Sequence, residues 1–252
     1  MSKLHPAEAD SAFVLHTYPY RETSLIVETF ARHAGRVSLI ARGARRPRAA
    51  LRGVLSPFQP LLLSWFGKGE LKTLKSAEPE RIYPQLSGSS LLSAFYLNEL
   101  ILKLAHRDDP HEKLFDAYDE AVHSLQQGMS DSGGEPKKSI AAVLRRFEKR
   151  LLTELGYGLM LDREADTGKP IHAQGRYVFI VERGALPEEV FRNAGDGALQ
   201  LSGKTLLDLA HDDYDDPITA QQAKQLMRYV INHYLDGAQL HTRQIIKELS
   251  GV

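Results

Sequence analysis

The spacing of hydrophobic residues divides the chain into a first part that predicts strands and a second part that predicts helices. Residues 35–42 show the strand pattern most clearly, with Val37, Leu39 and Ala41 alternating with a second set of side chains. A period of two is typical of a half-buried strand. The same kind of pattern predicts strands over residues 12–18, 24–31, 35–42, 53–66 and 69–83.

Five short strands within about seventy residues favour a small closed barrel, because closure removes the exposed edges of the sheet. An SH3-like barrel is the nearest alternative. Pro57 and Pro60 interrupt the fourth strand pattern. Two prolines indicate an edge, a bulge or a bend there, since proline cannot donate a ladder hydrogen bond.

Helical periodicity begins after Pro84. The most regular stripe runs from Ile140 to Leu155, with apolar residues three and four apart, and Gly156 is placed to end that helix. The other expected helices cover residues 91–104, 110–125, 202–210, 219–235 and 239–249. Residues 174–181 predict a strand or hairpin, and the composition of residues 128–136 predicts a flexible loop.

These patterns predict a two-domain α+β protein, in which a β-barrel is followed by an all-α helical domain. We expect a flexible extension over residues 1–11, the barrel over residues 12–83 and the helical domain over residues 84–252.

The composition narrows the class of protein. The 252 residues are 42% hydrophobic and 25% charged, as in soluble globular proteins. No apolar stretch is long enough to cross a membrane, and the first residues lack a signal core, so we expect a cytoplasmic protein without membrane contact. The chain has no cysteine, which excludes disulfides, cysteine nucleophiles and thiolate metal sites.

The net charge of zero conceals an asymmetry. Residues 1–83 hold 13 Lys and Arg against 7 Asp and Glu, or +6, and residues 84–252 hold 19 against 25, or −6. Residues 42–52 alone contain five arginines and no acid. A solvated loop is the plain interpretation, but a basic half of this kind also indicates contact with nucleic acid.

The motifs of enzymes are absent or incomplete. Gly203, Lys204 and Thr205 resemble the end of a phosphate-binding loop, but the first glycine is misplaced and Ser202 is better explained as a helix cap. The acidic residues 208–216 lack calcium-loop spacing and fit a helix N-terminus before Pro217. We therefore expect no catalytic site, metal or cofactor.

The barrel carries the two residue types that bind nucleic acid without sequence preference. Cations neutralise phosphates and aromatic rings stack on bases. The candidate DNA-binding residues are Arg36, Arg42, Arg45, Arg46, Arg48, Arg52, Lys68, Lys72, Lys75, Tyr20 and Trp65, and the other aromatic candidates are Tyr18, Phe58 and Phe66. Core packing is the alternative for Trp65 and Phe66, which point to opposite sides of a strand.

A second basic cluster lies beside the stripe of residues 140–155. It consists of Arg145, Arg146, Lys149 and Arg150, with only Glu148 among them. A basic helix next to apolar residues suits an acidic peptide with a hydrophobic end, although a solvated helix face is an equal alternative.

The ordered set of short motifs resembles the RecO family of recombination mediators. The motifs are AFVL at 12–15, YRETSL at 20–25, GRV at 35–37, ARGAR at 41–45, LSPF at 55–58, GELKTL at 69–74, YLNEL at 96–100, LRRFE at 144–148 and LGYG at 155–158. Each motif alone is weak, but their order and spacing hold over residues 12–249.

The resemblance implies an N-terminal OB-fold and a helical C-terminal domain. It implies binding of single- and double-stranded DNA, annealing of complementary strands and, with RecR in the RecFOR pathway, loading of RecA onto DNA coated by single-strand-binding protein (SSB). We place the acidic SSB tail at Arg145, Arg146, Lys149 and Arg150, with Lys224 and Arg228. The expected location is the cytoplasm, in association with the nucleoid.

One departure concerns zinc. Many members of the family carry a four-cysteine module after the LGYG motif, but residues 160–176 contain none here, so packing and hydrogen bonds must hold this region.

Two alternatives to DNA mediation stay open. One is a protein-interaction adaptor whose helical domain binds SSB or RecR, and the other is an RNA-binding protein, because phosphate and stacking contacts do not sense the 2′-hydroxyl.

Overall fold

The structure, a computed structural model, describes residues 9–127, 139–191 and 198–249. It forms two compact units, one drawn from residues 1–137 and 240–252 and the other from residues 138–239. The extension and the loop predicted at residues 1–11 and 128–136 lie almost wholly outside the described residues. Across the described chain, no helix has the length and hydrophobicity that a membrane span requires.

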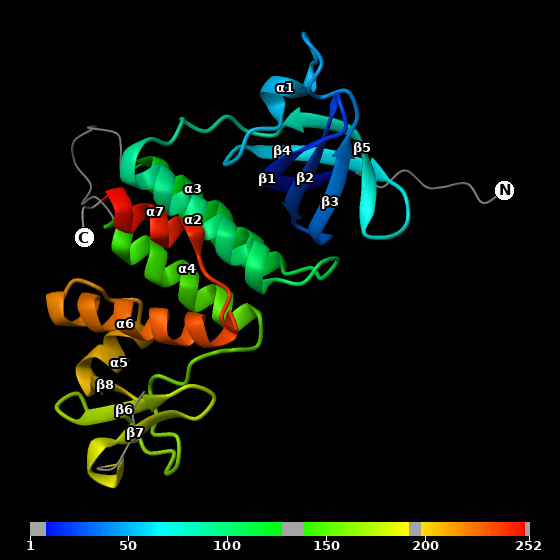
Figure 1. The fold of residues 1–252 in the computed structure, drawn as a ribbon. Helices are drawn as coiled ribbons and strands as arrows, with labels where there is room; N and C mark the ends of the chain where they lie inside the picture. Colours follow the sequence, from blue (N-terminus) through cyan, green and yellow to red (C-terminus); the bar gives the residue numbers. More distant parts are fainter. Residues whose placement is uncertain (1–8, 128–138, 192–197, 250–252) are drawn as a thin grey trace. The chain divides into compact units, whose positions relative to one another are not determined.

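The first unit begins with a closed five-stranded barrel (Figure 1). Its strands are β1 (Asp10–Tyr20), β2 (Ser24–Ala31), β3 (Gly35–Ala41), β4 (Pro60–Phe66) and β5 (Leu71–Pro79). They follow the order β1-β2-β3-β5-β4, and β4 pairs with β1 to close the ring. Only β3 and β5 are parallel. This topology confirms the predicted barrel and agrees with an OB-fold, a five-stranded Greek-key barrel.

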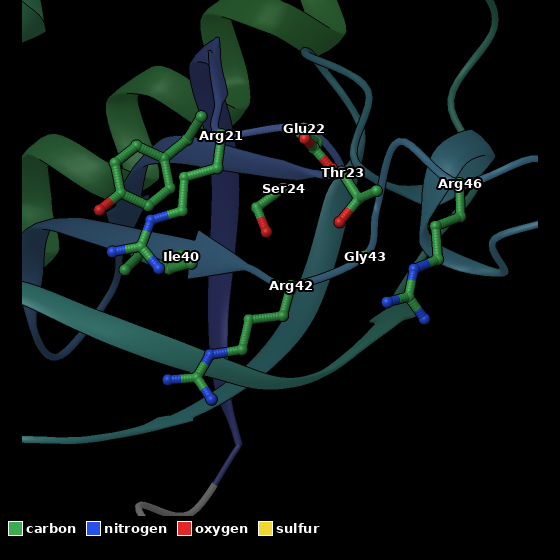
Figure 2. Close-up of a pocket in the computed structure, with 9 residues that line it drawn as sticks. Arg21, Glu22, Thr23, Ser24, Ile40, Arg42, Gly43 and Arg46 are labelled. Carbon is green, nitrogen blue, oxygen red and sulfur yellow. The ribbon is translucent and has the colours of Figure 1, made fainter.

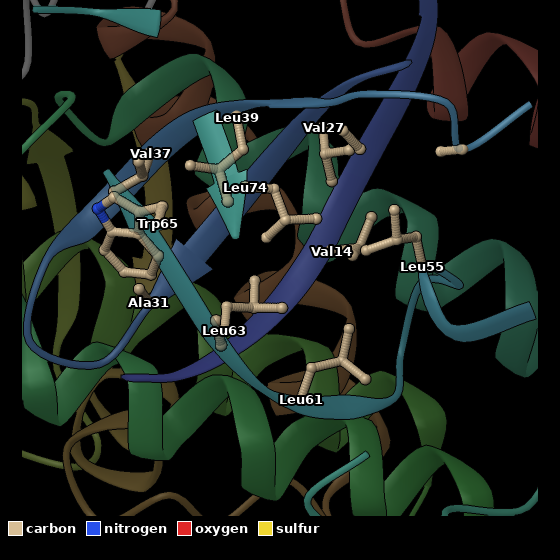
Figure 3. Packing of buried hydrophobic residues seen from close by; sticks show 13 residues of the cluster. Val14, Val27, Ala31, Val37, Leu39, Leu55, Leu61, Leu63, Trp65 and Leu74 are labelled. Carbon is tan, nitrogen blue, oxygen red and sulfur yellow. The ribbon is translucent and has the colours of Figure 1, made fainter. Parts of the chain in front are cut away.

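The interior of the barrel is a hydrophobic core, mostly aliphatic (Figure 3). Alternate residues of each strand point inward, so Val14, Val27, Leu39 and Leu63 meet there, each no more than 1% exposed. The strand predicted over residues 53–66 is shorter than expected. Short helix α1 (Leu51–Val54) precedes it and the strand starts at Pro60, the position where a missing N–H interrupts no ladder.

Three helices complete the first unit: α2 (Gly88–Leu104), α3 (Glu112–Gln127) and α7 (His241–Leu249). A buried polar chain joins α2 and α3 to the barrel. Asn98 of α2 donates to the carbonyl of Leu15 in β1 at 2.8 Å and accepts from the hydroxyl of Tyr118 in α3 at 2.5 Å. Because the amide and hydroxyl are buried, these bonds fix the helices against β1.

The second unit contains helices α4 (Ile140–Glu154), α5 (Gly203–Ala210) and α6 (Pro217–Tyr234). It also contains a small antiparallel sheet in the order β7-β6-β8, so the expectation of an all-helical part is too simple. The hairpin predicted near residues 174–181 is formed by β6 (Arg176–Ile180) and β7 (Gly184–Pro187), which a 3₁₀ turn (Glu188–Phe191) follows. The third strand, β8 (Leu199–Ser202), pairs antiparallel with the other edge of β6.

The caps predicted for these helices are present. Gly156 has a φ of +84°, and the N–H of Tyr157 donates to the carbonyl of Leu152 at 2.7 Å, which ends α4 in a Schellman motif. Ser202 accepts from the N–H of Thr205 to start α5. The carboxylate of Asp216 accepts from two N–H groups at the start of α6, and these bonds, that of Thr219 above all, lower its pKa.

Candidate nucleic-acid interface

A groove of about 740 Å³ lies between the β1–β2 turn and the segment that follows β3 (Figure 2). It is lined by Tyr20, Arg21, Glu22, Thr23, Ser24, Ile40, Arg42, Gly43 and Arg46. Three of these residues are cations and one is an anion, so the groove favours an anionic ligand.

Strand pairing explains why these residues meet. Tyr20 pairs with Ser24 across the β1–β2 turn, and Leu25 pairs with Ala41 at the end of β3. The N–H of Arg45 donates to the carbonyl of Thr23 at 2.9 Å, which holds the arginine-rich loop against the turn. Backbone pairing therefore places the arginines of this loop at one end of the barrel.

A glycine is required where the loop turns back. Gly43 has a φ of +70°, in the region that side chains rarely adopt, and its carbonyl accepts from the N–H of Arg46 at 3.0 Å. This turn sends Arg46 back along the groove.

The arginines of the groove are available for an incoming anion. Figure 2 shows the side chain of Arg21 extending from the β1–β2 turn and those of Arg42 and Arg46 extending from the segment after β3. The guanidinium of Arg21 lies 5.2 Å from the centroid of the Tyr20 ring. Within the described part of the chain, none of the three forms an ion pair with a carboxylate. An arginine whose guanidinium lies over an aromatic ring can still donate to a phosphate.

The structure leaves most of the predicted DNA-binding residues exposed. These are Arg42, Arg45, Arg46, Arg48, Lys68 and Lys75. Tyr20 is half-buried at the groove, and Lys68 lies in the turn between β4 and β5. The Arg52 side chain lies outside the described residues.

Two predicted cations have structural partners instead. Arg36 donates to the carbonyls of Leu102 and Ala105 at the end of α2, at 2.6 and 2.8 Å. Lys72 forms an ion pair with Asp108, in the connection after α2. The sequence gives no sign of these contacts because they join residues more than thirty positions apart.

Trp65 belongs to the barrel core and not to the surface (Figure 3). It is 7% exposed, whereas its neighbour Phe66 is 43% exposed. The prediction of Trp65 as a stacking residue is therefore corrected, because a base could reach its ring only if the core opened. Phe58 is buried as well and packs edge-on against Phe95 of α2, with centroids 5.0 Å apart.

Sequence reasoning missed Arg21, which stands outside the arginine run. Its position in the short connection between two predicted strands is the signal that could have found it. In an OB-fold the first and fourth connections, here residues 21–23 and 67–70, flank the surface that binds oligonucleotides.

The second basic cluster is largely engaged within its own unit. Arg145 is 9% exposed and donates to Glu148 at 2.6 Å. Lys149 donates to the carbonyl of Leu209 at 2.7 Å and pairs with Asp212 at 2.7 Å. The contacts of Lys149 join α4 to the last turn of α5 and to the loop after it.

Arg146 and Arg150 are likewise partnered. Arg146 donates to the Asp212 carbonyl at 3.2 Å and lies over the ring of Tyr214, and Arg150 is 3.5 Å from Glu154. Burial and the Asp212 carboxylate raise the pKa of Tyr214. By contrast, Lys224 and Arg228 are exposed on α6, and no described carboxylate pairs with either.

The region without cysteines is held by hydrogen bonds. The N–H groups of Glu164 and Ile171 donate to the carbonyls of Lys169 and Asp162, at 2.8 and 2.9 Å. The N–H of Ala165 donates to the carbonyl of Ala185 in β7, and Arg183 pairs with Asp166, both at 2.8 Å. Hydrogen bonds and an ion pair to the small sheet therefore hold this loop in place without cysteines.

Comparison with known proteins gives one consistent result. Residues 6–83 match the family model of the N-terminal domain of recombination protein O, and residues 85–244 match that of its C-terminal domain. The DNA repair protein RecO of Aromatoleum aromaticum is 48% identical over 251 residues, 99% of each chain. The DNA repair protein RecO of Thiobacillus denitrificans is 50% identical over 241 residues, which are 96% of this chain and 92% of the relative. That of Nitrosospira multiformis is 48% identical over 241 residues, which are 96% of this chain and 95% of the relative.

Proposed function

This chain belongs to the RecO family of DNA repair proteins, and from that premise we propose that it binds single- and double-stranded DNA without sequence preference and anneals complementary strands. We propose further that it acts with RecR to load RecA onto DNA coated by SSB. In this proposal it is a non-enzymatic mediator of the cytoplasm, associated with the nucleoid, and the barrel of residues 12–83 is the DNA-binding domain.

The groove of Tyr20, Arg21, Arg42 and Arg46 carries the proposal. Its cations sit on backbone-defined turns and have no carboxylate partners among the described residues, so binding phosphate breaks no internal ion pair. Neutralising phosphates releases condensed counterions, which is the main source of affinity that ignores sequence.

Annealing follows from the same electrostatics. Two DNA strands repel each other through their phosphates, and a cationic surface lowers this repulsion while the bases pair. The exposed cations beyond the groove, which include Arg45, Arg48, Lys68 and Lys75, extend the basic surface that a second strand can use.

For the acidic SSB tail, the structure favours α6 over α4. Lys224 and Arg228 are one helical turn apart and exposed. By contrast, cations of α4 already form ion pairs with Glu148, Asp212 and Glu154. We therefore propose Lys224 and Arg228 as the first contacts of the tail carboxylates, with Arg146 and Arg150 as secondary contacts.

A reciprocal experiment tests both sites. Two double variants make equal charge changes, one in the barrel (Arg42→Glu with Arg46→Glu) and one on α6 (Lys224→Glu with Arg228→Glu). Fluorescence anisotropy measures binding of each full-length protein to a labelled single-stranded 20-mer and to a labelled acidic peptide of the SSB tail. We expect the barrel variant to bind DNA more weakly and to keep its affinity for the peptide, and the α6 variant to do the reverse.

The adaptor alternative predicts a different result. In that case neither variant changes DNA binding, because the wild type binds DNA weakly or not at all. An RNA 20-mer of the same sequence completes the experiment. Tighter binding of the RNA than of the DNA would favour the RNA-directed alternative.

A further inference from the structure

One row of side chains crosses the outer face of the barrel. Tyr18 of β1 pairs with Ile26 of β2, which pairs with Ile40 of β3, then with Thr73 of β5, then with Phe66 of β4. Directly paired residues project to the same side of a sheet, so each of these five outward side chains lies beside the next one around the barrel. The two ends of the row are aromatic and exposed, Tyr18 by 47% and Phe66 by 43%.

A second row on the same face is cationic. Arg42 follows Ile40 by two residues and Lys75 follows Thr73 by two residues. Arg42 directly follows the end of β3, and Lys75 is the extra residue where the β4–β5 register shifts between the pairs Trp65–Leu74 and Ser64–Ser76. Because β3 and β5 are parallel, both cations follow the aromatic row in the same direction along the strands, and both are exposed. Tyr20 and Ser24 belong to this second row, since they are two residues beyond Tyr18 and Ile26 in the antiparallel pair.

The two rows are parts of one continuous surface with the groove. Ile40 stands in the middle of the aromatic row and also lines the groove. His16 packs against Tyr18, with ring centroids 4.4 Å apart, and supports the Tyr18 ring from its own strand. An apolar and aromatic track bordered on one side by cations matches the layout of a single nucleic-acid strand, whose bases and phosphates form two parallel edges.

We infer that Tyr18 and Phe66 are base-stacking residues for an unpaired DNA strand that crosses the barrel with its phosphates toward Arg42 and Lys75. The inference rests on the proposed function and names the residues that distinguish single strands from duplexes. Charge complementarity selects this ligand, because three arginines and a single acidic residue, Glu22, are among the described residues that line the groove.

The assignment has a consequence for strand choice. The bases of a duplex are stacked on each other, so a duplex can use the cations but not the aromatic row. Stacking also occupies the faces of the bases and leaves their hydrogen-bonding edges free. A strand held on Tyr18 and Phe66 can therefore still pair with its complement.

The test uses the full-length double variant Tyr18→Ala with Phe66→Ala. Binding is measured to a fluorescein-labelled dT20, to an abasic oligonucleotide with the same number of phosphates and to a 20-base-pair duplex. We expect the affinity for dT20 to fall by about 5-fold or more for each ring removed, and the other two affinities to stay unchanged. The ring-preserving variant Tyr18→Phe with Phe66→Tyr is expected to retain wild-type affinity.

Leu71→Ala is the matched control. Leu71 lies on β5 two residues before Thr73, is 39% exposed and has no ring, so its truncation removes apolar surface without a stacking face. It should leave dT20 binding unchanged.

The outcomes are distinct. Unchanged dT20 binding in the alanine double variant, or an equal loss for all three ligands, would overturn the stacking role. The Arg42→Glu with Arg46→Glu variant separates this failure from failure of the proposed function. If that variant loses all three ligands, the DNA site stands without the stacking row, and if it loses none, the proposed function itself fails.

Discussion

The guanidinium of Arg36, in β3, donates to the carbonyl of Ala105 at the C-terminal end of α2, at 2.8 Å. The same group donates to Leu102 and lies 3.7 Å from Glu28. Arg36 therefore caps a helix and joins it to the barrel, although in sequence it is one more arginine of a basic segment. A basic residue serves DNA binding only if the fold leaves its donors unused.

The pair Arg36 and Arg42 allows a direct comparison. We expect Arg36→Ala to lower the free energy of unfolding by about 1.5–3 kcal/mol, because it removes charge-assisted hydrogen bonds to two carbonyls. Arg42→Ala should weaken DNA binding and leave stability nearly unchanged. Urea denaturation and anisotropy measure the two effects, and a stability loss in Arg42→Ala equal to that in Arg36→Ala would contradict this division of roles.

Salt should weaken DNA binding steeply. With about five phosphate contacts, the logarithm of the affinity for a single strand should fall with the logarithm of salt concentration with a slope of about −3 to −4. The Arg42→Glu with Arg46→Glu variant should show a flatter slope, since it makes fewer phosphate contacts. Titrations at four or more salt concentrations measure the slope, and affinity that survives several hundred millimolar salt would contradict an electrostatic interface.

Truncation of two neighbouring aromatic residues should destabilise the protein by very different amounts. Trp65 fills the barrel core, so Trp65→Ala should destabilise the protein by about 3–5 kcal/mol through the cavity it leaves. Phe66→Ala removes an exposed ring and should cost less than about 1 kcal/mol. Thermal unfolding followed by circular dichroism compares them, and similar shifts of Tm would mean that Phe66 is also part of the core.

Glu99 of α2 links stability to pH through α7. Its carboxylate accepts from the N–H groups of His241 and Thr242, at 2.7 and 2.9 Å, and from the Thr242 hydroxyl at 2.6 Å. Burial alone would raise the pKa of this carboxyl, but these hydrogen bonds outweigh burial and hold the pKa below its ordinary value. The carboxylate therefore binds the N-terminus of α7 best when it is ionised.

A pKa lowered by folding gives stability that is complete above the ordinary carboxyl pKa, about 4.3, and is lost as the pH falls through the folded value. We expect Glu99→Gln to lose about 1–3 kcal/mol at pH 7 and to show a weaker pH dependence than wild type below pH 5. Denaturation midpoints between pH 7 and 3 measure this difference. Parallel pH curves for the two proteins would show that Glu99 does not carry the dependence.

The sequence by itself determined the local structure and the type of ligand. Local patterns depend only on residues a few positions apart, so they predict helices and strands without knowledge of the fold. Examples are the strand period of two, the helical stripes and cap residues such as Ser202. The barrel, the order of the helices and the excess of positive charge in residues 1–83 were predictable for this reason. The small sheet was predicted only in part, because β8 is short and pairs with a strand twenty residues away.

Only the tertiary structure decided which side chains are available. Arg36, Lys72 and Trp65 resemble the exposed candidates in sequence, but contacts with distant residues or burial in the core occupy them. Arg21 joins the groove because strand pairing brings its turn beside the end of β3. Local pattern sets what an element is and what charge it carries, whereas long-range packing sets which groups are satisfied internally and which stay free to bind DNA.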